Sequence, residues 1–153
     1  MHILGNMLML YAFVHTLEST LGLLPFIACY LLWGLVGGLC QAAMDWGQDI
    51  PLVGASGAIA GMIGAYTVLY GYDAKIRCLL WLPIPTLIFR PIKIDVPAIV
   101  FGLVWIGLQL WDASSDPEGM MGVAWFAHIG GFIAGLLLMK YIFQVKGRRY
   151  GWK

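Results

Sequence analysis

Five long apolar runs, separated by short polar stretches, dominate the sequence. They cover roughly residues 2–17, 24–44, 54–71, 95–111 and 122–143. Each run is near the ~17–25 residues with which an α-helix crosses a bilayer, and no tandem repeat or low-complexity tract divides them. The pattern predicts an all-α protein, a polytopic transmembrane helical bundle of about five spans. We expect one domain over residues 1–153, with a basic tail at residues 144–153.

The stretch between the third and fourth runs, residues 72–94, has a different character. It mixes cations such as Lys75 and Arg77 with aromatic and aliphatic residues such as Trp81. This mixture is typical of a segment that lies on the membrane surface. Two prolines, Pro83 and Pro85, argue against a further span.

The composition supports a membrane protein and excludes several classes of function. Apolar residues make up 61% of the chain and charged residues 11%, whereas a soluble domain is about one quarter charged. The net charge of +1 leaves no basic stripe for nucleic acid. The three cysteines have neither disulfide nor metal-site spacing, and no Cys/His cluster occurs. We therefore expect no nucleic-acid partner, no metal and no cofactor.

The cations also predict the orientation of the bundle. All nine Lys and Arg residues fall within residues 72–94 or 140–153, and such residues concentrate on the cytoplasmic side. With five spans, these two regions share that side. We expect an integral, multi-pass protein of a prokaryotic inner membrane, with a cytoplasmic C-terminus. The starts of the first, third and fifth runs then approach the outer face.

Two side chains near those starts are candidates for chemistry. Ser56 lies two residues into the third run, and His128 lies about 9 Å into the fifth if that helix begins near Gly122. A serine and a histidine at similar depth form a candidate dyad of nucleophile and general base. A helix N-terminus at Ser56 also favours a developing oxyanion. The alternatives are a serine that only allows close packing and a histidine satisfied by a carbonyl or water.

Small residues line one edge of each of these two runs. Gly54, Gly57 and Gly61 mark the third run, and Gly131 and Gly135 continue a four-residue spacing from Ala127 in the fifth. Small residues let membrane helices approach closely. We expect the two edges to pack together and to bring the imidazole to the hydroxyl.

His2 and Asn6 lie four residues apart, on one face of the first run and at its outer end. They are candidates to donate hydrogen bonds to an oxyanion beside the backbone N–H of Ser56. A polar pair at a helix end is the ordinary alternative. The third histidine, His15, is near the cytoplasmic end of its run and is most simply structural.

Three motifs together resemble the rhomboid family of intramembrane serine proteases. They are H-I-L-G-N-M from His2, G-A-S-G-A-I-A-G from Gly54 and A-H-I-G-G-F-I-A-G from Ala127. Their order and spacing are specific to that family, and the resemblance covers nearly the whole chain.

The resemblance implies a six-helix core that cleaves transmembrane protein substrates in the bilayer. It assigns the nucleophile to Ser56, the general base to His128, and the oxyanion hole to His2, Asn6 and the Ser56 amide. The chain begins where the family's second helix normally starts, so we expect the first helix to be missing. Ala60 occupies a position where many members carry an aromatic residue that packs on the catalytic histidine. His128 is therefore expected to be held less firmly, or by another ring.

Other functions remain possible at this point. One is a non-catalytic rhomboid-like scaffold that binds membrane segments, although such proteins generally lack the serine or the histidine. Another is an inactive, N-terminally truncated protease. A small transporter would need ionisable residues across the whole membrane, whereas the polar side chains gather at the outer end.

Overall fold

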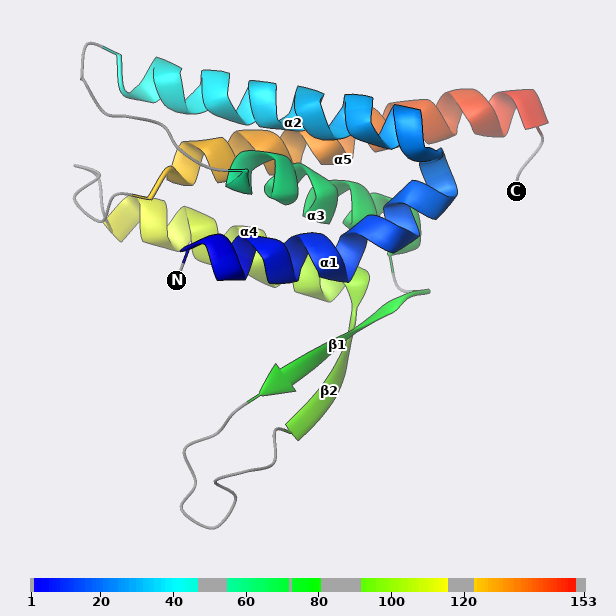
Figure 1. The fold of residues 1–153 in the computed structure, drawn as a ribbon, viewed down its shortest axis with the longest axis horizontal. Coiled ribbons are helices and arrows are strands. Elements are labelled where there is room, and N and C mark those ends of the chain that lie inside the picture. The colour runs from blue at the N-terminus through cyan, green and yellow to red at the C-terminus, as the bar shows by residue number, and fades with distance from the viewer. Residues whose placement is uncertain (1, 47–54, 72, 81–91, 116–122, 151–153) are drawn as a thin grey trace.

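The computed structural model describes residues 2–46, 55–71, 73–80, 92–115 and 123–150. In these parts the chain forms five α-helices and a two-stranded antiparallel sheet (Figure 1). The helices are α1 (His2–Leu21), α2 (Leu23–Met44), α3 (Ser56–Tyr70), α4 (Ala98–Ser115) and α5 (Trp125–Tyr150), and the strands are β1 (Lys75–Leu80) and β2 (Ile92–Pro97). The expected all-α membrane bundle is confirmed, with a small hairpin added to it.

Helix α3 lies in the middle of the bundle, with the other four helices packed around it (Figure 1). Residues 57–67 of α3 are all buried. With 15 residues the helix is about 22 Å long, which is less than the ~30 Å hydrocarbon core. A helix this short places its first residue below the membrane surface unless the bilayer thins around it.

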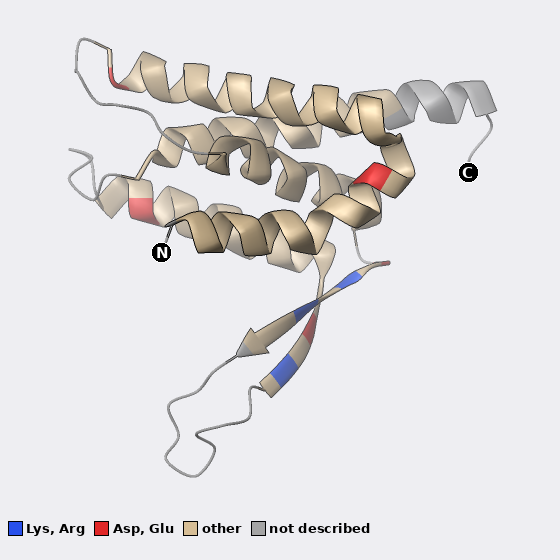
Figure 2. Ribbon diagram, viewed as in Figure 1, with Lys and Arg blue, Asp and Glu red and all other residues tan. Residues whose placement is uncertain are grey.

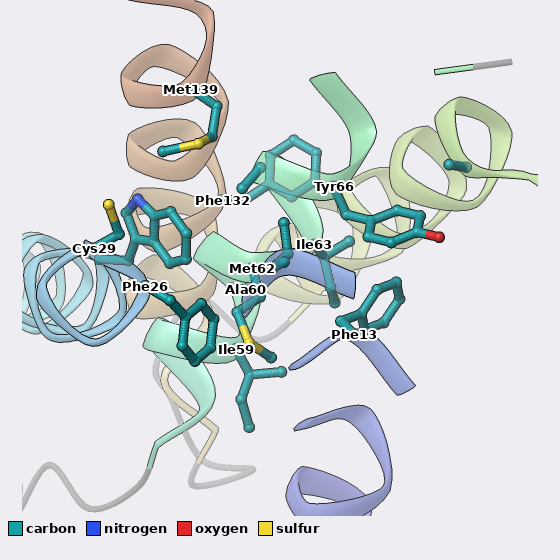
Figure 3. Packing of buried hydrophobic residues seen from close by; sticks show 14 residues of the cluster. Phe13, Phe26, Cys29, Ile59, Ala60, Met62, Ile63, Tyr66, Phe132 and Met139 are labelled. Carbon is teal, nitrogen blue, oxygen red and sulfur yellow. The ribbon is translucent and has the colours of Figure 1, made fainter. Parts of the chain in front are cut away.

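The core consists of buried side chains of α3 together with those of the neighbouring helices that pack against them. Met62, Ile63 and Tyr66 of α3 pack among rings such as Phe13 of α1 and Phe132 of α5 (Figure 3). The ring centroids of Phe13 and Tyr66 are 5.0 Å apart in an edge-to-face arrangement. Each neighbouring helix is thus fixed against the central one by interlocking side chains, on which association in lipid depends.

The outer surfaces of the helices are apolar, and the charged residues gather at helix ends and on the hairpin (Figure 2). Large exposed side chains include Leu8, Leu31, Leu103 and Leu137. By length and composition, three described helices can cross a membrane: α2, α4 and the Trp125–Ile142 part of α5. An apolar exterior around an apolar core suits a protein whose solvent is lipid.

Glycines end two of the helices. Gly22 has a φ of 87° between α1 and α2, and Gly71 has a φ of 45° at the end of α3. Both conformations are left-handed, which glycine adopts without a steric cost. Beside the second turn, the Tyr70 hydroxyl donates to the Thr16 carbonyl over 3.1 Å and also hydrogen bonds with the Thr20 hydroxyl. These contacts join α1 to α3 at the end where the hairpin begins.

The hairpin was not predicted from the sequence, and it corrects the expected start of the fourth helix. Residues 95–97 were expected to open the fourth helix, but they form the end of strand β2. The helix therefore begins at Ala98. The register pairs Arg77 with Asp95 and Cys78 with Ile94, which places charged and apolar side chains on opposite faces. At the other end of the chain, α5 continues to Tyr150 into the expected tail. Residues 81–91 and 151–153 lie outside the described parts.

Candidate active site

A cavity of about 280 Å³ lies among the four helices α1, α3, α4 and α5. Ten residues line it: Gly5, Asn6, Met9, Ser56, Ile59, Ile63, Trp105, Gln109, Trp125 and His128. Three of the four predicted site residues, Asn6, Ser56 and His128, are among them. The side chain of the fourth, His2, lies outside the described residues, although its backbone begins α1.

Ser56 is the first residue of α3, preceded by Ala55 as the N-cap. The residue before the serine therefore offers no side-chain cap. The first N–H groups of any helix lack partners within the helix, and they carry the positive end of its dipole. The serine hydroxyl consequently stands beside a group of donors that favours negative charge.

His128 lies in the first turn of α5, because that helix begins at Trp125. This corrects the expected start near Gly122, which is outside the described residues, and halves the expected depth of His128 to about 4.5 Å along the helix. The side chain is nonetheless buried. Its place at the start of α5 matches that of Ser56 at the start of α3.

The two helices approach each other through glycines, as their spacing suggested. A Cβ on Gly131 would lie 2.9 Å from the Gly57 carbonyl carbon, and one on Gly135 would lie 2.7 Å from the Gly61 carbonyl carbon. Both distances are shorter than real Cβ contacts, so only glycine fits. Gly61 also faces Trp33 of α2. Gly54 lies outside the described residues.

Tryptophan rings hold the imidazole in the place of the family's usual aromatic residue. The ring centroid of His128 is 5.9 Å from that of Trp105 on α4 and 6.2 Å from that of Trp125. Ala60, which occupies the usual position of that aromatic residue, is fully buried near Gly131 in the contact between α3 and α5. Of the two expectations for His128, the structure supports the one with another ring.

A glutamine of α4 completes the surroundings of the imidazole. The Oε1 atom of Gln109 is 2.6 Å from Nδ1 of His128. Among the ten lining residues, His128 is the one with a basic side chain. The polar groups around it are neutral amides and a hydroxyl, set into walls formed by side chains such as Met9, Ile59 and Ile63.

A second glutamine fixes the start of α5 from a neighbouring helix. The buried Gln41 of α2 accepts a hydrogen bond from the Ala127 backbone N–H over 3.1 Å. Its Nε2 donates to Asp45 over 2.8 Å. An N–H in the first turn of α5 thereby gains a side-chain acceptor one residue before His128.

Neither the two glutamines nor the two tryptophans were predicted from the sequence as part of the site. Gln41 and Gln109 each interrupt an apolar run, and a polar residue inside a span is a recognisable signal for an interhelical hydrogen bond. The partners were not predictable, because they depend on which helices become neighbours. No group of three or more His, Cys, Asp or Glu residues that could hold a metal occurs in the described parts of the chain.

The sequence also matches the model of a known protein family. The family model described as the Rhomboid domain matches residues 1–145. No curated protein and no solved structure matches the chain.

Proposed function

The chain belongs to the rhomboid family, an integral membrane family whose members are usually intramembrane serine proteases, and we propose that this member is an active one. Its substrates are transmembrane segments of other proteins, which it cleaves with Ser56 as nucleophile and His128 as general base. The observation that carries the proposal is the single cavity to which Asn6, Ser56 and His128 all contribute.

The reaction follows the usual course of a serine hydrolase. His128 takes the hydroxyl proton of Ser56 while the serine oxygen attacks the peptide carbonyl carbon. The carbonyl oxygen becomes an oxyanion, to which the Asn6 side chain and the Ser56 backbone N–H donate hydrogen bonds. His128 then returns the proton to the leaving amine, and the peptide bond breaks to leave an acyl-enzyme.

Water completes the cycle from the aqueous side of the cavity. His128 removes a proton from the water molecule as it attacks the ester, and then gives that proton to the Ser56 oxygen as the acid is released. The side chain of His2 is proposed as a further oxyanion donor, on the basis of the family motif. This site opens to the outer face, and the C-terminus of α5 lies in the cytoplasm.

The walls of the cavity support a peptide substrate of membrane origin. Met9, Ile59 and Ile63 offer apolar contacts next to the reacting groups. The substrate must leave its helical conformation before attack, because helical peptide groups are hydrogen-bonded and screened by side chains. Residues of low helix propensity near the cleaved bond lower the cost of that step.

A fluorophosphonate probe tests the proposal on the folded chain in detergent. The probe should label Ser56, and the label should be absent from the Ser56→Ala and His128→Ala variants. The parent, but neither variant, should also cleave a reporter with a single transmembrane segment. Absence of both labelling and cleavage in folded parent protein would favour a scaffold that binds membrane segments without cutting them.

A further inference from the structure

We infer that Gln109 is a positioning residue for His128, which it holds in the one tautomer that can act as base towards Ser56. The inference rests on the proposed Ser56–His128 dyad and adds a third member to it. Gln109 belongs to α4, whereas His128 belongs to α5, and the two side chains meet at the cavity with a distance of 2.6 Å between Oε1 and Nδ1.

The chemistry of the two groups determines where the proton lies. A neutral imidazole has one N–H donor and one acceptor nitrogen, and an amide oxygen can only accept. The contact with Oε1 therefore requires the proton of His128 to be on Nδ1. The Nε2 atom then carries the lone pair, as a general base requires.

The opposite orientation of the amide would have the reverse effect. If the NH₂ group of Gln109 faced Nδ1, that nitrogen would have to accept, and the proton would move to Nε2. His128 could not then take a proton from Ser56 through Nε2. The orientation of one neutral side chain thus determines whether the dyad is competent.

Helix α4 is well placed to exert this control. Trp105 and Gln109 are four residues apart and so share one face of the helix. The first contacts the His128 ring through its indole, and the second contacts the ring edge at Nδ1. The Trp105 contact fixes the position of the His128 ring, and the Gln109 contact determines its tautomer.

A neutral amide suits an apolar cavity better than a carboxylate. A permanent charge would be costly to bury when His128 is neutral. The Nδ1–H···O bond becomes charge-assisted, and therefore stronger, only when His128 takes the proton of Ser56. Gln109 consequently stabilises the transition state more than the resting state, which is the condition for an effect on kcat.

The tautomer can be measured directly by nitrogen NMR of the full chain labelled with ¹⁵N-histidine. The protein has three histidines, and the His128 signals are assigned by their loss in His128→Ala. In the parent, Nδ1 should carry the proton. In Gln109→Leu, which keeps a similar volume but has no acceptor, a large fraction of the proton should move to Nε2.

Kinetic measurements distinguish a positioning role of Gln109 from a role in packing alone. In Gln109→Leu, kcat should fall by roughly 10–10²-fold with little change in KM, because the loss is confined to general-base catalysis. Gln109→Glu, which restores an acceptor oxygen, should recover the Nδ1–H tautomer and part of kcat. Leu110→Ala is the matched control, since that neighbour of Gln109 on α4 is 53% exposed. In this variant the His128 tautomer and kcat should equal those of the parent.

An unchanged tautomer in Gln109→Leu would overturn the inference, as would a failure of Gln109→Glu to recover the Nδ1–H form. Failure of the proposed function looks different. In that case the parent is neither labelled nor catalytic, while the NMR comparison still reports whether Gln109 sets the tautomer of His128.

Discussion

Replacing Gly131 with alanine should separate the helices that carry the proposed dyad. The new Cβ would lie 2.9 Å from the Gly57 carbonyl carbon, and closer still to its oxygen. The obstacle is backbone, which cannot rotate away as a side chain can. Helices α3 and α5 must therefore move apart locally by at least about 0.5 Å, the difference between 2.9 Å and the 3.4 Å of an ordinary contact.

Two measurable losses follow from this movement. Overpacking of this kind costs about 1–3 kcal/mol of stability. Gly57 directly follows Ser56, and Gly131 lies within one turn of His128, so the serine oxygen and the imidazole should also move apart. A misplacement approaching 1 Å can cost about 10²-fold in rate. We expect Gly131→Ala to lower kcat by roughly 10–10²-fold.

Gly107→Ala is the matched control, because a Cβ at Gly107 meets nothing within 4 Å. It makes the same chemical change in α4 without a steric conflict, and should unfold at the parent temperature or slightly above it. Thermal unfolding in detergent and initial rates of reporter cleavage should be measured for both variants. If Gly131→Ala matched Gly107→Ala in both assays, the close contact between α3 and α5 would be refuted.

Three further predictions concern residues around the site and on the hairpin. Asn6→Ala should lower kcat by about 10²-fold as the loss of one oxyanion donor; an unchanged rate would make Asn6 structural. Gln41→Leu should lower stability by about 1 kcal/mol, the low end for a lost buried hydrogen bond, because the Ala127 N–H also bonds the Ala124 carbonyl; an unchanged unfolding midpoint would contradict this. The hydrogen bond from Arg77 holds the pKa of Asp95 below its usual value, so the stabilisation from this pair is present above the ordinary carboxyl pKa and is lost as pH falls through the lowered one. Arg77→Gln should raise the pKa of Asp95 in a ¹³C carboxyl titration, and an unshifted pKa would argue against the pairing.

The helices were predictable from the sequence because their signals are local. Apolar runs of spanning length require helices in a bilayer, where each backbone group must find its partner within the segment. The glycine spacing in the third and fifth runs similarly indicated which edges would meet, and Gly131 lies against Gly57 in the structure. Local patterns therefore account for the bundle and for the shared position of Ser56 and His128 at its cavity.

The remaining features depend on neighbours that the sequence does not specify. Residues 75–80 and 92–97 alternate between the two faces of the hairpin, but the eleven intervening residues, three of them prolines, obscured the pairing. Gln109 was visible as a polar residue in an apolar run, whereas its contact with His128 arises from the packing of α4 against α5. Trp105 and Trp125 pack on His128 where an aromatic residue at position 60 would otherwise do so. Both tryptophans lie far from Ala60 in the chain.

The central position of α3 also has a consequence for how the protein is made. The helix that carries Ser56 is short and is held by Gly131 and Gly135 of α5, which the ribosome produces about seventy residues later. Until α5 has entered the membrane, the nascent chain contains the serine but neither the imidazole nor the surface that encloses it. On the proposed function, synthesis therefore delivers an inert intermediate, and the proposed dyad is assembled only when the last of the five described helices has docked.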